Sequence, residues 1–351
     1  MSQHSELPMT LGYFSDCADS QRNKGYKRNQ LKMNVKTKVI PQESNKTVVT
    51  EFFLLGFQVS QGLRLFLFGL FFVVYCGTIC GNLLIIVLVS KSKILHTPMY
   101  FFISHLSVSD VVLTTSIVPK MFHVILNNGA TITFIGCITQ FYFFCATESS
   151  ECFLLTAMAY DRYVAICNPL RYSSIMTSGH CVILAAICWL VGFSITLFST
   201  VTTAMLNFCG SNIIDHLYCD MVPMLELACS DAFIVRLEIS VIGMPCVFIA
   251  TTIILVSYTY IVLAILRIPS STGRQKAFST CSSHLIVVSM FYFTLFSVYV
   301  LPTKGLALSV SKTLSLLYIV FTPLANPIIY SLRNKDIKKA IEGTLHKPVI
   351  W

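Results

Sequence analysis

Seven long apolar runs, each able to cross a lipid bilayer, constrain this chain more than any other feature of its sequence. A membrane-spanning helix needs about 20 consecutive apolar residues. The runs are 63–89, 99–118, 134–166, 181–205, 233–266, 276–301 and 314–332. Only 12% of the residues are charged, about half the share in an ordinary globular domain, which excludes a soluble fold. We therefore predict an all-α membrane protein with a seven-transmembrane helix bundle over residues 61–333.

The charges between these runs predict the orientation of the chain, because Lys and Arg in short loops stay on the cytoplasmic side. Basic residues follow the first, third, fifth and seventh runs, whereas the other short loops hold little beyond Lys120 and Lys304. This pattern predicts an extracellular N-terminus and a cytoplasmic C-terminus. Seven basic residues between Arg22 and Lys38 favour the opposite orientation, but they lie well before the first run, where the charge rule fades.

Polar segments flank the bundle at both ends. Residues 1–60 are expected to form an extracellular N-terminal tail, and residues 334–351 a cytoplasmic segment. Within the second segment, 334–342 predicts a short amphipathic helix. Its apolar residues Ile337, Ala340 and Ile341 fall at helical spacing, and nearby lysines are available for lipid headgroups.

Short motifs at the ends of the runs narrow the class of protein. They are LHTPMY at 95–100, MAYDRYVAIC at 158–167, SY at 257–258, KAFSTCSSH at 276–284, PLANPIIY at 323–330 and NKD at 334–336. Together and in this order they resemble the vertebrate olfactory receptors, a family of rhodopsin-like G-protein-coupled receptors. The resemblance runs from about residue 45 to 339, and residues 1–32 have no counterpart in a typical member.

The MAYDRYVAIC motif holds the residues expected to reach the G protein. An arginine at the membrane edge is costly unless it is paired or hydrated, and Asp161 beside Arg162 supplies a partner in the resting state. The resemblance implies that Arg162 faces the G protein in the active state, when Tyr258 and Tyr330 close around it. Tyr163 is the third residue of the Asp-Arg-Tyr triplet and is expected to belong to the same group. The alternative is a simple Arg–Asp pair at the membrane edge.

Four polar residues at apolar depth form a second expected group, namely Asn82, Asp110, Glu151 and Asn326. Such side chains are expensive in a membrane and usually face the bundle interior and one another. The resemblance implies a hydrated cluster that rearranges on activation. A bound sodium ion and a hydrogen-bond network without an ion both remain open, and no other cofactor is expected.

The resemblance places a small-molecule site among the outer halves of the third, fifth, sixth and seventh helices. The residues it implies are Phe144, Cys145, Glu148, Ser149, Ile242, Gly243, Cys246, Tyr292, Leu295, Phe296, Tyr299 and Ile319. For any one of them, ordinary helix packing is the alternative. This mostly apolar lining suits a volatile or lipophilic ligand. Glu148 either pairs with an amine-bearing ligand or stays protonated or hydrated near Glu151, and we favour the second interpretation.

Two disulfide bonds follow from the resemblance, one between Cys137 and Cys219 and one between Cys209 and Cys229. An extracellular setting permits both bonds. Asn45 begins an Asn-Lys-Thr sequon and is a candidate glycosylation site. The other cysteines lie in or beside the runs and are interpreted as small apolar side chains.

The expected function is that of a plasma-membrane odorant receptor. It would bind small, mostly apolar molecules within the bundle and activate a stimulatory G protein, which raises cyclic AMP. No nucleophile–base pair, metal cluster or phosphate loop is recognisable, so no enzyme is expected. Two alternatives remain. One is a receptor of the same family that senses a metabolite outside the nose, and the other is a channel or transporter.

Overall fold

The computed structural model describes residues 49–209, 211–299, 308–333 and 335–345. The candidate glycosylation site Asn45 and the atypical segment 1–32 lie outside these residues. The described residues all belong to one compact unit, Val48–Trp351.

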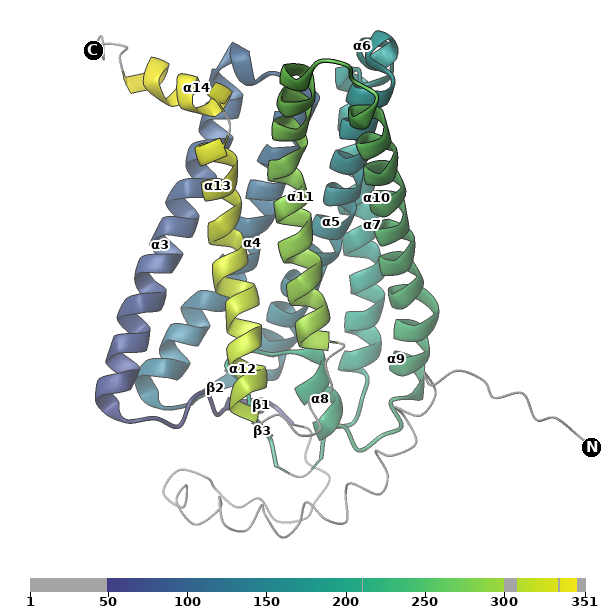
Figure 1. Ribbon diagram of the computed structural model, residues 1–351. Coiled ribbons are helices and arrows are strands. Elements are labelled where there is room, and N and C mark those ends of the chain that lie inside the picture. Colours follow the sequence, from purple (N-terminus) through teal and green to yellow (C-terminus); the bar gives the residue numbers. More distant parts are fainter. Residues whose placement is uncertain (1–48, 210, 300–307, 334, 346–351) are drawn as a thin grey trace, which may run out of the picture. The chain divides into compact units, whose positions relative to one another are not determined.

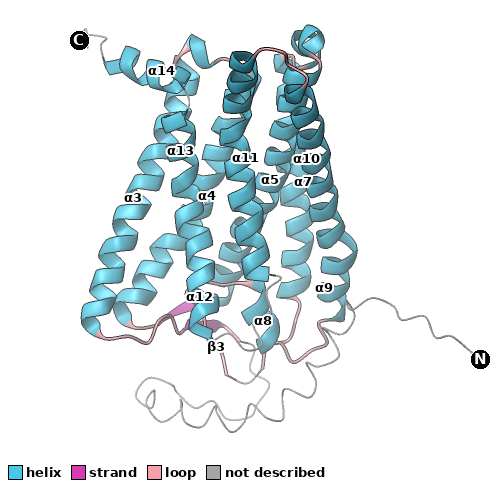
Figure 2. Ribbon diagram, viewed as in Figure 1, coloured by secondary structure: helices cyan, strands magenta, loops and turns pink. Residues whose placement is uncertain are grey.

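Seven long helical segments lie side by side in a bundle, as the apolar runs predict (Figure 1; Figure 2). They are α3 (Gln61–Lys91), α4 (Pro98–Asn127), α5 (Phe134–Cys167), α7 (Ser178–Ala204), α9 (Phe233–Glu238) with η3 (Ile239–Gly243) and α10 (Met244–Leu266), α11 (Ser271–Tyr299), and α12 (Leu308–Leu316) with η4 (Leu317–Phe321) and α13 (Thr322–Arg333). The fifth and seventh segments each contain a π-helical turn, η3 and η4.

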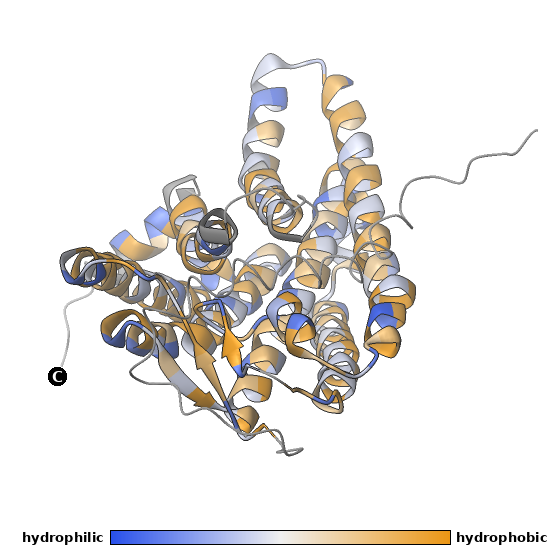
Figure 3. Cartoon of the chain, turned by 90° about the horizontal axis from the view of Figure 1, so that it is seen from below, coloured by the Kyte–Doolittle hydropathy of each residue, from blue (hydrophilic) through white to orange (hydrophobic). Residues whose placement is uncertain are grey.

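The outer surface of the bundle is apolar, as a lipid-facing surface must be. Phe66, Val73 and Phe248 each expose 65–69% of their surface. Viewed from one end of the bundle, hydrophobic residues cover large parts of the long helices (Figure 3). Among the described residues five helical segments pass a length and hydropathy test for spanning a membrane, or six if α11, bent by 40°, is one span. The remaining segment, α5, is less apolar because it carries buried carboxylates.

The second helix is longer than its apolar run predicts. It continues through Pro119 to Asn127, whereas the run ends at 118. The extra turns bury Met121 and Val124 completely against the core, and this packing offsets the backbone hydrogen bond that a proline removes. The helix ends at Asn128, whose left-handed backbone is a common helix terminator.

A small sheet covers one end of the bundle, which we call the sheet end. It consists of β1 (Glu51–Leu54), β2 (Ala130–Thr133) and β3 (Ile213–Ile214), in the order β2-β1-β3. β1 runs antiparallel to β2 and parallel to β3. The sequence predicts a polar tail over 51–54 and no sheet, because such short strands leave little periodicity to detect.

The opposite end of the bundle carries α14 (Lys335–Leu345), and we call it the α14 end (Figure 1). Ile337 and Ala340 of this helix are buried, whereas Lys338 and Lys339 are exposed. The predicted amphipathic helix is therefore confirmed. The Tyr100 hydroxyl donates a hydrogen bond of 3.1 Å to the Asp336 carboxylate, which ties α14 to the start of α4. This contact joins two of the motifs recognised in the sequence.

Four shorter helical elements complete the described structure: η1 (Lys93–Leu95), η2 (Pro169–Arg171), α6 (Tyr172–Ile175) and α8 (Met221–Leu227). Apolar side chains form two clusters, one toward each end. The cluster toward the α14 end includes Leu95, Tyr258 and Tyr330, and the cluster toward the sheet end includes Phe52 and Phe144.

Candidate functional site

The Asp161–Arg162 pair is buried near the α14 end of α5. The Arg162 guanidinium donates to Asp161 Oδ2 through Nε at 2.8 Å and also through Nη2. The other carboxylate oxygen, Oδ1, accepts a 2.8 Å bond from the Tyr172 hydroxyl of α6. Burial and the Asp161 charge raise the pKa of Tyr172 above its usual range, which keeps this donor protonated. Both oxygens of Asp161 are thus occupied, and Arg162 is in the paired arrangement expected of a resting state.

Tyr258 and Tyr330 belong to the apolar cluster toward the α14 end. Neither hydroxyl is hydrogen-bonded to Arg162. The Tyr258 hydroxyl is 2.5 Å from His284 Nδ1, and both side chains are buried. The hydroxyl of Tyr330 is buried and has no hydrogen-bond partner among the described residues. His284 ends the KAFSTCSSH motif, but the sequence alone predicts no role for it. Its presence in a motif at a helix end was the signal that could have identified it.

Tyr163 packs on a different face of α5. Its ring meets Tyr260 of α10 edge-on, with centroids 5.9 Å apart. The structure therefore places it in the contact between α5 and α10 rather than beside the arginine pair.

Three of the four predicted polar residues come together in the middle of the bundle. Asn326 Nδ2 donates to the Asp110 carboxylate at 3.0 and 3.2 Å and also hydrogen-bonds Glu151. Glu151 Oε1 and Asn326 Oδ1 are buried and have no hydrogen-bond partner among the described residues. Two carboxylates and an amide oxygen in one place are hard donors of the kind that hard cations prefer.

Asn82 serves the backbone of α13 instead. Its Nδ2 donates to the Pro323 carbonyl at 3.0 Å and to the Thr78 carbonyl at 3.0 Å. Pro327 has no N–H with which to bond the carbonyl four residues before it. The Asn82 amide replaces this missing donor and joins α3 to α13.

Part of the predicted ligand set gathers beneath the sheet end. Phe144 and Ile319 are completely buried there, and Cys145 packs against the large apolar cluster that includes Phe52 and Phe144. The Tyr318 hydroxyl hydrogen-bonds the Glu148 carboxylate, whose Oε1 has no partner among the described residues. We call Phe144, Cys145, Glu148, Tyr318 and Ile319 the sheet-end cluster.

Other members of the predicted ligand set lie elsewhere. Ser149 Oγ is 3.4 Å from Thr196 Oγ1 in the contact between α5 and α7, and the Tyr292 hydroxyl is 3.4 Å from Cys152 Sγ. Phe296 exposes 53% of its surface and lies on the outside of the bundle, because its position on α11 turns it from the interior. Leu295 packs against the cluster toward the α14 end.

The fifth segment supplies the remaining predicted contacts. Ile242 and Gly243 lie in the π-helical turn η3, and Cys246 follows in α10. All three are partly exposed. The side chain of Tyr299 lies outside the described part of the structure.

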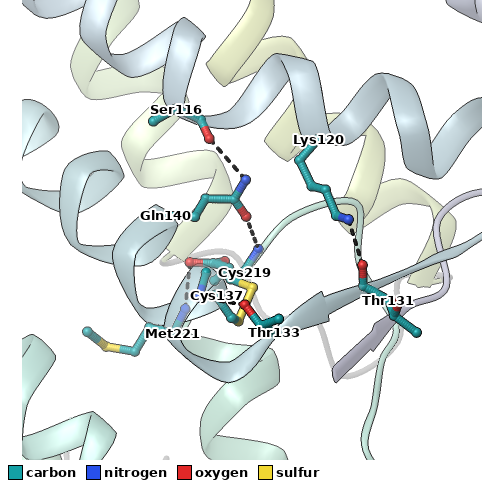
Figure 4. The surroundings of a disulfide bond; sticks show 10 residues. Ser116, Lys120, Thr131, Thr133, Cys137, Gln140, Cys219 and Met221 are labelled. Atoms are coloured by element: carbon teal, nitrogen blue, oxygen red, sulfur yellow. Dashed lines mark hydrogen bonds between the residues drawn. A yellow bond between two sulfur atoms is a disulfide. The ribbon is translucent and has the colours of Figure 1, made fainter. Parts of the chain in front are cut away.

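The loop between α7 and α9 closes over the sheet-end cluster. The structure contains a disulfide between Cys137 and Cys219, with Cα atoms 5.5 Å apart, and one between Cys209 and Cys229. These are the pairs that the resemblance implies. Gln140 accepts from the Cys219 backbone at 3.0 Å and donates to the Ser116 carbonyl at 3.1 Å, which fixes the loop to α4 and α5 (Figure 4).

Tyr218 connects this loop to the sheet-end cluster, a contact that the sequence does not predict. Its ring meets Phe144 edge-on, with centroids 5.4 Å apart. Burial and the nearby Asp220 raise the pKa of Tyr218 well above its usual range, so the phenol stays neutral. Only the folded chain shows the contacts of Tyr218, Tyr318 and Gln140, because each contact joins residues that are distant in the sequence.

The arrangement of the helices is the seven-helix fold of the rhodopsins. The crystal structure of squid rhodopsin matches this fold with a TM-score of 0.65 at 18% identity, over 82% of this chain and 87% of that one.

Sequence comparison identifies the family. A family model described as olfactory receptor matches residues 71–347. Human olfactory receptor 11L1 is 43% identical over 312 residues, which cover 88% of this chain and 97% of that protein. Mouse olfactory receptor 5G25 is 47% identical over 304 residues, or 86% and 95% of the two chains. The chain belongs to the olfactory receptor family of G-protein-coupled receptors, and the members of this family are not enzymes.

Proposed function

We propose that this protein is an odorant receptor that binds small, mostly apolar molecules and activates a stimulatory G protein. The observation that carries the proposal is the closed arrangement of Asp161, Arg162 and Tyr172, with the Tyr258–His284 contact beside it. Arg162 becomes available to a partner only when Asp161 releases it. Release and capture give the two states that a ligand-controlled receptor needs.

The ligand would occupy the region around the sheet-end cluster. Its apolar members, with a few polar groups, suit a lipophilic molecule. The hydrogen bond between Tyr318 and Glu148 supports the interpretation in which Glu148 remains part of a polar network near Glu151. The unpartnered Oε1 of Glu148 leaves a hydrogen-bond acceptor for a polar group of the ligand.

The cluster of Asp110, Glu151 and Asn326 would hold a sodium ion in the resting state. The two buried oxygens that have no described hydrogen-bond partner, Glu151 Oε1 and Asn326 Oδ1, support this assignment. Such an ion would neutralise part of the negative charge that the two carboxylates bring into the membrane.

We place the receptor in the plasma membrane with its sheet end outside the cell and its α14 end inside. Both disulfides belong to the sheet end, and disulfides persist in oxidising surroundings. The exposed Lys338 and Lys339 of α14 suit the anionic cytoplasmic leaflet. This arrangement also agrees with the loop charges.

The direct test is cyclic AMP in cells that express the chain with an olfactory-type stimulatory G protein, against a broad odorant panel. We expect at least one odorant to raise cyclic AMP. Arg162→Ala should abolish the rise at equal surface expression, because the variant lacks the group that Asp161 releases. Arg171→Ala is the matched control, since Arg171 is exposed at the same end, and it should retain the response.

An odorant response that survives Arg162→Ala would contradict the proposed mechanism. Silence of the surface-expressed receptor across the panel and across a metabolite panel would contradict the proposed function.

A further inference from the structure

Lys312 is a buried lysine in a chain whose other basic residues lie mostly in loops and tails. It lies in α12 at the sheet end and exposes 6% of its surface. Its Nζ forms an ion pair with the Asp215 carboxylate and donates a 3.0 Å hydrogen bond to the Gly56 carbonyl. Lysine is almost never fully buried unless it is paired. One ammonium group thus joins three segments that are far apart in the sequence.

Gly56 presents its carbonyl to Lys312 through a backbone that requires glycine. Its φ is +66°, and a Cβ atom there would lie 2.7 Å from Val124 Cγ1. The Gly56 N–H donates to the His216 carbonyl at 3.1 Å. Segment 213–219 is therefore attached to the turn after β1 through the backbone and to α12 through Lys312.

The same face of α12 and η4 continues from Lys312 to the sheet-end cluster. A side-chain hydrogen bond joins Ser315 to Tyr218, and Tyr318 bonds Glu148. Residues three apart lie on one side of a helix, so Lys312, Ser315 and Tyr318 form a row from the loop to the cluster. Displacing Asp215 from Lys312 would loosen the loop segment that ends in Tyr218 and Cys219.

We infer that Lys312 is a positioning residue for the ligand site. Its contacts with Asp215 and Gly56, which we call the Lys312 latch, hold segment 213–219 closed over the sheet-end cluster. Small molecules reach this cluster from the sheet end when the latch opens. The inference rests on the proposed function only for the claim that the cluster is a ligand site, and its test needs neither an odorant nor a G protein.

Cys145 supplies the measurement. It is a free, partly buried cysteine that lies close enough to Glu148 and Asp220 to interact with their charges. The probe is a small, charged, membrane-impermeant thiosulfonate reagent, applied to the purified receptor in lipid nanodiscs, where both ends of the bundle meet solvent. The labelling rate of Cys145 is obtained by subtracting the labelling of a Cys145→Ser background.

The variants are Lys312→Met, Asp215→Asn and Lys312→Arg, compared with Lys120→Met. Lys120 is a matched control because it is a lysine at the same end whose exposed ammonium donates to the Thr131 carbonyl. Asp215 is one-third exposed, so we expect the Asp215→Asn variant to fold. It therefore tests the ion pair even if Lys312→Met fails to fold.

We expect Lys312→Met and Asp215→Asn to raise the Cys145 labelling rate about tenfold, which corresponds to about 1.4 kcal/mol of lost latch stability. Lys312→Arg should stay near the unmodified rate, because the ion pair is kept, and so should Lys120→Met. An unchanged rate in Asp215→Asn would overturn the inference. An equal rise in Lys120→Met would also overturn it, because the effect would then be a general loosening of this end.

Discussion

At the scale of single residues, the ionisable groups at the sheet end show most clearly how burial determines chemistry. His216 is buried in the loop with its ring edge-on to Tyr218, at a centroid distance of 4.3 Å. Burial, together with the positive charge of Lys312, lowers its pKa to about 3. Its neighbour Asp215 pairs with Lys312. His216 is therefore neutral in the folded receptor at any physiological pH.

This depressed pKa predicts a loss of stability in acid. Between pH 3 and 6.5 the unfolded chain protonates this histidine and the folded chain does not, so stability falls as the pH drops through this window. At pH 5 the loss is about 2 kcal/mol. Thermal unfolding in nanodiscs should show a smaller acid sensitivity for His216→Phe than for His123→Phe, whose histidine is exposed at the same end. Equal acid sensitivity of the two variants would contradict the assignment.

At the scale of helices, one close approach between α5 and α7 depends on a glycine. A Cβ atom on Gly192 would lie 2.5 Å from Ser150 Oγ and 2.7 Å from Ser150 N. Because one of these atoms is backbone, the two helices would have to separate. The absence of a side chain at Gly192 therefore sets how closely α7 packs on α5.

Gly192→Ala should destabilise the receptor although alanine is the better helix former. Overpacking of this kind typically costs about 1–3 kcal/mol. Gly179→Ala, in the same helix but with nothing within 4 Å of the added methyl group, should leave the melting temperature unchanged or raise it. Differential scanning fluorimetry of both variants checks this pair. A stabilised Gly192→Ala would show that the helices pack less closely than the structure has them.

The sequence predicted the helices well because each spanning segment leaves a long apolar run. It predicted less of what holds them together. The second apolar run ends just before Pro119 and Lys120. In the structure, packing of Met121 and Val124 extends the helix to Asn127. The π-helical turns η3 and η4 and the sheet of β1, β2 and β3 depend on contacts between distant segments, which no local pattern records.

For the candidate site, the sequence indicates which residues are polar at membrane depth, but not which atoms they bond. The resemblance implies one polar group of Asn82, Asp110, Glu151 and Asn326, and the structure brings the last three of these together. The resemblance could not show that Asn82 bonds the Pro323 carbonyl or that Phe296 lies on the outer surface. Both depend on how each helix is rotated about its axis, and apolar runs that are hydrophobic all round do not specify that rotation.

At the scale of the whole molecule, the proposed ligand site and the proposed switch lie in different apolar cores. The sheet-end cluster belongs to one apolar core and Tyr258 and Tyr330 to the other. Asp110, Glu151 and Asn326 connect α4, α5 and α13 within the bundle.

Shifting the receptor from 1:99 to 99:1 in favour of its active state takes about 5.5 kcal/mol of differential affinity. This is most of the roughly 8 kcal/mol that a micromolar ligand provides. Partial activation by a single odorant is the expected behaviour.

The central claim is that the Asp161–Arg162 pair holds this receptor in its resting state. The most direct measurement is nucleotide exchange on a purified stimulatory G protein by receptor in nanodiscs without odorant. Asp161→Asn removes the charge that retains Arg162, and should raise basal exchange by up to about tenfold for about 1.4 kcal/mol of lost pairing. Asp231→Asn, at an exposed aspartate of the sheet end, should leave it unchanged. Basal exchange that Asp161→Asn does not raise above the level of Asp231→Asn would contradict the account.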